Sequence, residues 1–190
     1  MNTVLTESYS SAAVAAGHVS SFSNAPAMTR FGALLLQPSQ ILTVQSPLPG
    51  FEALQNFSLI AVAGQQPFVW LQSLEDASVA FLLVTASHFG LTYRGFDPSA
   101  DVMVMVLLPE QSGQALRPHR QAPLVFDAAG GRFVQSVIED GDVQGDGLFR
   151  AVTNSSAADM TSGLVGRLVL LAQADPDPAR DSSQAAQATA

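Results

Sequence analysis

The chain has 190 residues, 47% of them hydrophobic, which is enough for one domain with a core of ordinary size. Its sixteen acidic residues face eight arginines and no lysine, and the net charge is −8. This charge disfavours direct nucleic-acid binding, which needs a basic patch to neutralise phosphates, and favours a basic protein as partner. The lack of cysteine excludes disulfides, thiolate catalysis and cysteine-ligated zinc.

Small and polar residues dominate the first segment, residues 1–27. Such a segment buries too little apolar surface to offset the entropy of ordering it, so we predict a disordered N-terminal tail. Its first residues have neither the positive charge nor the unbroken apolar run of a secretory signal. The longest apolar run, residues 102–109, is far too short to span a membrane. We therefore expect a cytoplasmic protein that makes no membrane contact.

From residue 28 onward the chain consists of short apolar runs separated by Pro, Gly, Asp and Gln. Most runs are four to eight residues long and rich in Val, Leu and Phe, which is typical of strands. This spacing predicts a mainly β fold over residues 28–152, a small antiparallel β-barrel or roll with a few short helices. Residues 102–108 are apolar at every position, so both faces of that strand should be covered. The runs are 31–36, 41–44, 57–63, 68–74, 79–84, 102–108, 123–126 and 132–138.

The apolar period becomes helical after residue 152. Met160, Leu164, Leu168 and Leu171 would lie on one face of a helix, and Ser156 with Asp159 has the spacing of a capping box. We predict a C-terminal helix over 153–173, docked on the barrel or presenting its apolar stripe to a partner. Residues 174–190 have the composition of a second disordered tail.

The sequence contains no recognisable catalytic or metal-binding motif. Its three histidines are far apart, and no nucleophile elbow or phosphate-binding loop occurs. Asp140, Asp142 and Gln144 match the first ligand spacings of an EF-hand loop, but the twelfth position is Ala151 where a bidentate Glu is required. This acidic loop is better interpreted as a solvated hairpin or as a contact for a basic protein. We predict a protein without enzymatic activity, metal or cofactor.

Two blocks of sequence resemble the FliW flagellar assembly factor family. The first is the turn Pro-Gly-Phe-Glu at 49–52, and the second is Pro-Phe-Val-Trp-Leu-Gln-Ser-Leu at 67–74. The segment 102–110 resembles the family's central apolar strand, and the resemblance covers roughly residues 30–150. The positions that carry the structural signature are Pro49, Gly50, Phe51, Phe68, Trp70, Phe81 and Pro123.

The resemblance implies a regulator that binds a CsrA-type translational repressor and also flagellin, so that flagellin synthesis is coupled to its export. The alternatives are a small-ligand-binding β-barrel, an unrecognised enzyme or a purely structural module. The four aromatic residues of the signature are expected to pack in the core. The polar residues expected to be exposed and to shape the binding face are Gln72, Ser73 and Gln135, and those expected to steer the partner, or else to be solvated surface charges, are Glu75, Asp76, Glu139, Asp140 and Asp142.

Overall fold

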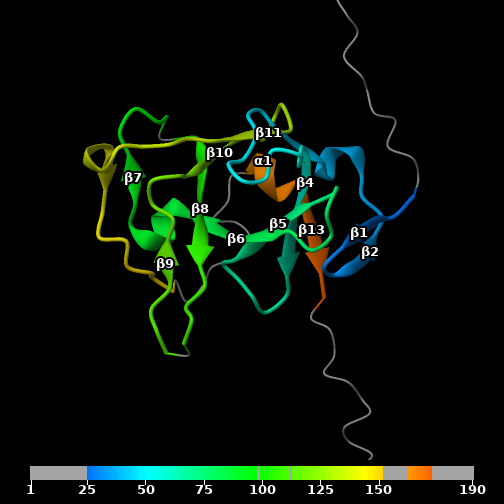
Figure 1. Cartoon of the computed structure of the whole chain (residues 1–190), viewed down its shortest axis with the longest axis horizontal. Helices are drawn as coiled ribbons and strands as arrows, with labels where there is room; N and C mark the ends of the chain where they lie inside the picture. The colour runs from blue at the N-terminus through cyan, green and yellow to red at the C-terminus, as the bar shows by residue number, and fades with distance from the viewer. Residues whose placement is uncertain (1–24, 98, 112, 152–161, 173–190) are drawn as a thin grey trace, which may run out of the picture.

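The computed structural model describes residues 25–97, 99–111, 113–151 and 162–172 (Figure 1). The two tails predicted from the sequence therefore lie almost wholly outside the described residues. The same is true of 153–161, the first part of the predicted C-terminal helix.

Within the described residues, seven strands pair in a closed ring. The order is β3, β4, β5, β6, β8, β10, β11, and the ring closes through a parallel pair between β11 and β3. The other six pairs in the ring are antiparallel. The predicted mainly β barrel with few helices is thus confirmed. The strands are β3 (Leu42–Val44), β4 (Asn56–Val62), β5 (Val69–Ser73), β6 (Ala80–Thr85), β8 (Asp101–Leu107), β10 (Leu124–Asp127) and β11 (Arg132–Gln135).

The barrel interior is filled by side chains that alternate along the strands, because successive residues of a strand point to opposite faces. On β4, Phe57 and Leu59 belong to this interior cluster and are 0% exposed. The ring of Phe57 meets that of Phe133 on β11 edge to face, with centroids 5.3 Å apart. Leu48 and Leu54, from the loop before β4, join the same cluster. The interior is therefore a packed core.

A second core lies outside the ring, against β6 and β8. On β8, Met103 belongs to the interior cluster, whereas its neighbour Val104 belongs to the second cluster, and both are 0% exposed. The prediction that both faces of the run 102–108 are covered is thus confirmed for the middle of the strand, but not for its end, where Leu107 is 48% and Leu108 65% exposed. The covering elements are η2 (Ala86–Phe89), β7 (Thr92–Tyr93) and β12 (Val143–Gln144), of which β7 and β12 pair with each other. The short 3-10 helix η3 (Asp140–Asp142) precedes β12 and has no buried residue.

A small hairpin lies over the outer surface of β5. It consists of β1 (Ala27–Thr29) and β2 (Gly32–Leu34), joined by a turn at Arg30 and Phe31. The Arg30 guanidinium lies 4.3 Å from the ring centroid of Trp70. The hairpin and β7 lie at opposite ends of the molecule (Figure 1). Two further short elements are η1 (Pro38–Gln40) and β9 (Arg117–Pro118), which pairs with β8.

The C-terminal part of the fold differs from the prediction. A helix is present as α1 (Ser162–Val165), but the following residues form strand β13 (Leu168–Leu171), which pairs in parallel with residues 59–62 of β4. The helix expected over 168–171 is therefore wrong. β3 pairs with β4 only at Asn56 and Phe57, so the backbone groups farther along β4 still need hydrogen-bond partners. β13 supplies these partners along the same edge of β4. The folded unit thus extends beyond residue 152.

No helix in the described part of the chain combines the length and apolar character that crossing a membrane would need.

Candidate functional site

Gln72 is a structural residue, contrary to the expectation that it would be exposed. It is 0% exposed, and its Nε2 donates to the carbonyl oxygens of Ser73 at 2.9 Å and Val79 at 3.1 Å. Its Oε1 accepts a hydrogen bond from the Arg30 backbone N–H at 3.2 Å. One amide therefore joins the β5–β6 turn to the β1–β2 hairpin. Burial beneath this hairpin overturns the expectation, because strand periodicity does not show what covers an outward-facing residue.

Ser73 was also expected to be exposed, and it is 0% exposed. Its Oγ accepts hydrogen bonds from the backbone N–H groups of Glu75 at 3.2 Å and Asp76 at 3.1 Å. A serine that closes a turn on the following backbone in this way is a common turn device. The Gln-Ser pair of the signature therefore builds the turn after β5.

The acidic residues of this turn are exposed and hydrogen-bonded. The Glu75 carboxylate accepts from the backbone N–H of Asn56 at 2.9 Å and from its side-chain Nδ2 at 2.8 Å. Oδ1 of Asp76 accepts from the hydroxyl of Ser78 at 2.6 Å and from its backbone N–H at 2.8 Å. These two bonds, the hydroxyl first, hold the pKa of Asp76 below its ordinary value. Both carboxylates thus stabilise the turn.

The second acidic group lies at the other end of the molecule, beside β7. Asp142 Oδ1 is 3.3 Å from the Arg94 guanidinium, and Asp140 Oδ1 is 3.9 Å from Arg120 Nε. Glu139 is exposed and precedes η3. The first acidic group, Glu75 and Asp76, lies in the β5–β6 turn, which Gln72 joins to the β1–β2 hairpin at the opposite end of the molecule (Figure 1). The structure therefore does not bring the two acidic groups together.

The remaining predicted positions have mixed environments. Gln135 is half-buried on β11. Phe81 packs against the interior cluster, and Phe68 packs against the outer one, where it stacks on Phe149 with centroids 5.3 Å apart. Phe51, expected in the core, is 37% exposed and rests edge to face on Phe81.

The backbone conformation of the turn at Pro49 and Gly50 explains its glycine. Gly50 has φ of +82°, a conformation that other residues rarely adopt, which explains glycine at this position of the signature. Its N–H donates to Glu52 Oε1 at 2.9 Å, and this bond lowers the pKa of the Glu52 carboxyl. Pro123 is buried just before β10.

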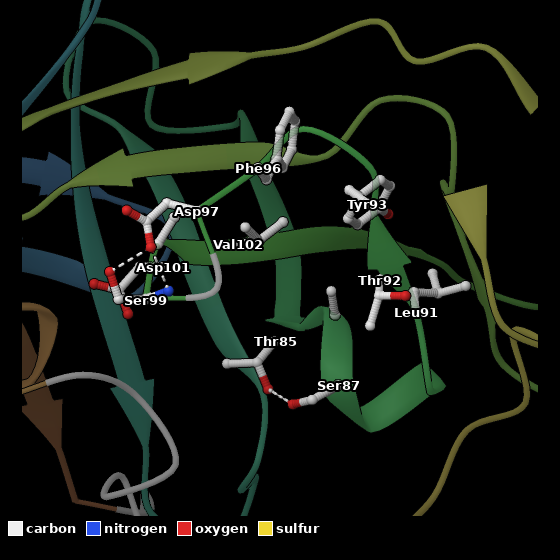
Figure 2. Close-up of a pocket in the computed structure, with 12 residues that line it drawn as sticks. Thr85, Ser87, Leu91, Thr92, Tyr93, Phe96, Asp97, Ser99, Asp101 and Val102 are labelled. Carbon is white, nitrogen blue, oxygen red and sulfur yellow. Dashed lines mark hydrogen bonds between the residues drawn. The ribbon is translucent and has the colours of Figure 1, made fainter. Parts of the chain in front are cut away.

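A cleft of about 530 Å³ that the sequence did not reveal lies beside η2 and β7 (Figure 2). The rings of Tyr93 and Phe96 have centroids 5.5 Å apart. The Tyr93 hydroxyl donates to the Arg120 carbonyl at 2.9 Å, and burial raises the pKa of Tyr93 to about 12. In the sequence, the Phe-Asp-Pro turn at 96–98 indicates a loop here but not a cavity. The lining residues are Thr85, Ala86, Ser87, Leu91, Thr92, Tyr93, Phe96, Asp97, Ser99, Ala100, Asp101 and Val102.

The described residues contain no group of three or more His, Cys, Asp or Glu side chains placed to hold a metal ion. What these residues do show is a closed, filled β-barrel with an acidic loop at each end and an open cleft beside η2 and β7.

Comparisons with known proteins assign the chain to a family. A family model described as "FliW protein" matches residues 26–146, well over half of the chain, so the protein belongs to the FliW family. It is 29% identical over 124 residues to the flagellar assembly factor FliW of Syntrophus aciditrophicus, covering 59% of this chain and 78% of the relative. It is 30% identical over 127 residues to the flagellar assembly factor FliW of an Azoarcus species, covering 57% of this chain and 86% of the relative.

A crystal structure of the flagellar assembly factor FliW has the same fold. Its TM-score with this protein is 0.54 at 20% sequence identity, and the match covers 65% of this chain and 96% of that one.

Proposed function

We propose that this protein is a non-enzymatic flagellar assembly factor that binds a CsrA-type translational repressor and flagellin in the cytoplasm. Competition between the two partners would couple flagellin synthesis to its export. The observation that carries this proposal is the FliW match over residues 26–146, which runs from the β1–β2 hairpin to just past β12. The relatives that align over most of their own length are named as flagellar assembly factors.

The charge of the chain supports a basic partner. A net charge of −8 attracts a positively charged RNA-binding protein over a distance of about 8 Å at physiological salt and repels the RNA that it binds. Arg94 and Arg120 offset part of the charge of Asp142 and Asp140. We therefore assign this attraction to the net charge of the whole chain, with Glu139 as the contact candidate in this loop.

Among the alternatives, a small-ligand-binding barrel has little support. The barrel interior contains Phe57, Phe133 and Leu124, each 0% exposed, where a ligand-binding barrel would enclose a cavity. A thermal-shift screen against metals and metabolites tests this alternative directly, because a tight ligand raises the unfolding temperature by mass action.

The deciding experiment is a calorimetric titration of the full chain with purified flagellin and, separately, with the CsrA-type repressor of the same organism. We expect saturable binding of at least one of them, and displacement of the repressor by flagellin if both bind. The association rate with the basic repressor should fall as salt rises, as it does for electrostatically steered partners. Binding of neither protein would refute the proposal.

A further inference from the structure

The C-terminal elements α1 and β13, residues 162–171, are an addition to a barrel that closes without them. The seven-strand ring is completed by the pair between β11 and β3, and β13 pairs with β4 outside that ring (Figure 1). The family model ends at residue 146, before either element begins. The surface beneath this C-terminal segment therefore belongs to the part of the chain that matches the family, whereas its cover does not.

The C-terminal segment fills a groove with two leucines and a length of extended backbone. Leu164 is 1% exposed and Leu168 is 6% exposed, and both belong to the interior cluster. The Leu171 carbonyl accepts a hydrogen bond from Ala63 N–H at 2.8 Å, just past the parallel pair with β4. The groove thus combines a strand edge with a seat for apolar side chains.

Backbone carbonyls of the barrel hold one guanidinium at the end of this groove. Arg167 donates to the carbonyl oxygens of Ser39 at 2.8 Å and Ala129 at 3.1 Å, and also to that of Ala128. A guanidinium offers five N–H donors in a rigid fork and stays charged, so it can meet three acceptors from two loops at once. The carbonyls therefore select arginine at this position.

The walls of the groove lie wholly within residues 26–146. They come from β4, from η1 and from the turn between β10 and β11. A chain reduced to that part would present an unpaired edge along residues 59–63 and an uncovered apolar seat. An open edge is a template for pairing with another chain, and strand addition takes its affinity from main-chain bonds and its specificity from side-chain pockets.

We propose that the C-terminal segment is an internal competitor for a partner strand. The groove accepts an extended partner segment with the pattern Leu-x-x-Arg-Leu, which is the spacing of Leu164, Arg167 and Leu168. The docked segment excludes this partner, and its release opens the groove without opening the ring. A tethered competitor has an effective concentration on the order of millimolar, so it sets a threshold that the partner must exceed. The inference rests on the proposed function in one respect, namely that the partner is a protein.

Hydrogen exchange of the full chain tests whether the segment opens separately from the ring. The Ala63 N–H reports on β13, and the amides of β6, which lies between β5 and β8, report on the ring. We expect Ala63 to exchange at least about tenfold faster than the most protected amides of β6, because local opening costs less than global unfolding. Arg167→Ala should speed exchange at Ala63 by about a further tenfold. Equal exchange of both in the wild type and in Arg167→Ala would overturn the proposal.

A labelled peptide of residues 160–173 tests what the groove recognises. The groove is opened by Leu164→Asp with Arg167→Glu, and the matched control is Leu170→Asp, because Leu170 belongs to the same strand but is 73% exposed. We expect the peptide to bind the double variant at least about tenfold more tightly than the wild type or the control. A peptide with Arg167→Ala should bind at least about tenfold more weakly, because it lacks the charge-assisted bonds.

Equal affinity of the peptide for all three proteins, or none for a folded double variant, contradicts the groove. If the double variant does not fold, Arg167→Ala in the full chain is measured instead. An affinity for the peptide equal to that of the wild type then contradicts the groove.

Titrations with flagellin and with the CsrA-type repressor separate this inference from the proposed function. The open variant should bind one of them at least about tenfold more tightly than the wild type, and the peptide should compete with that partner. Affinities for both partners that equal or fall below those of the wild type overturn the internal competitor while the proposed function stands. If neither form binds either protein, the proposed function fails and the inference fails with it.

Discussion

Replacing Gln72 tests whether this residue of the signature supports the fold or contacts a partner. Its buried amide donates to carbonyl oxygens of the β5–β6 turn, with Val79 at 3.1 Å among them, and accepts from Arg30 N–H. Each net hydrogen bond contributes roughly 1 kcal/mol, and a buried group left unpaired costs about 1–3 kcal/mol. Adding the cavity left by the missing side chain, we expect Gln72→Ala to lower the free energy of unfolding by about 3 kcal/mol.

Gln72→Glu sharpens the test because it keeps the shape and removes the donor. An ionised carboxylate facing the same carbonyls is buried without a donor to offer, so its folded-state pKa is raised above the unfolded value. The variant should therefore be least stable at pH 8 and recover part of its stability at pH 5, where the carboxyl becomes protonated and can donate.

The assay is urea unfolding followed by the fluorescence of Trp70, the single tryptophan, which lies beneath Arg30. Gln135→Ala is the control, since Gln135 is half-buried, and we expect a loss under about 1 kcal/mol. If Gln72→Ala costs under about 0.5 kcal/mol yet weakens partner binding by the folded protein, the structural interpretation of Gln72 is wrong.

Three further predictions concern other parts of the fold. The Oγ of Ser58 is buried and has no hydrogen-bond partner among the described residues. Ser58→Ala should therefore raise the free energy of unfolding by about 1 kcal/mol in the same urea assay. A lower free energy of unfolding would show that the hydroxyl is hydrogen-bonded in the folded protein. Arg167 donates to the carbonyl oxygens of Ser39 at 2.8 Å and Ala129 at 3.1 Å, and also to that of Ala128. Arg167→Ala should therefore lower the free energy of unfolding by about 2 kcal/mol, and Arg167→Lys should lose only part of that amount. An unchanged urea midpoint for Arg167→Ala would contradict this role. The Arg132 side chain donates to Oδ2 of Asp127 at 2.8 Å and is the main cause of the lowered pKa of the Asp127 carboxyl. The stability that this carboxylate contributes is therefore complete above the ordinary carboxyl pKa and is lost as pH falls through the lowered pKa. Asp127→Asn should flatten the acid limb of a curve of unfolding free energy against pH, and an identical limb would refute the link.

Several features could be predicted from the sequence because they depend on local pattern. The strand-length apolar runs and the turns between them indicate a barrel, since period-two segments must bury one face. The uninterrupted apolar run on β8 indicates that both of its faces are covered, and Met103 and Val104 confirm this for the middle of the strand, whereas Leu107 at its end is exposed. The glycine of the signature turn reports the left-handed conformation at Gly50.

Other features depend on what the rest of the chain places beside a residue. Leu168 fits a helical stripe and a strand equally well by periodicity, and the edge of β4 that continues beyond β3 decides in favour of the strand. Gln72 lies on an outward face of β5, and the β1–β2 hairpin buries it. The cleft arises because η2, β7 and the start of β8 meet around Asp97 and Tyr93, which a linear pattern cannot report. Residue order along the chain determines which side of a strand a residue faces, whereas non-local pairing determines what covers that side, because burial depends on distant segments that meet only when the chain is folded.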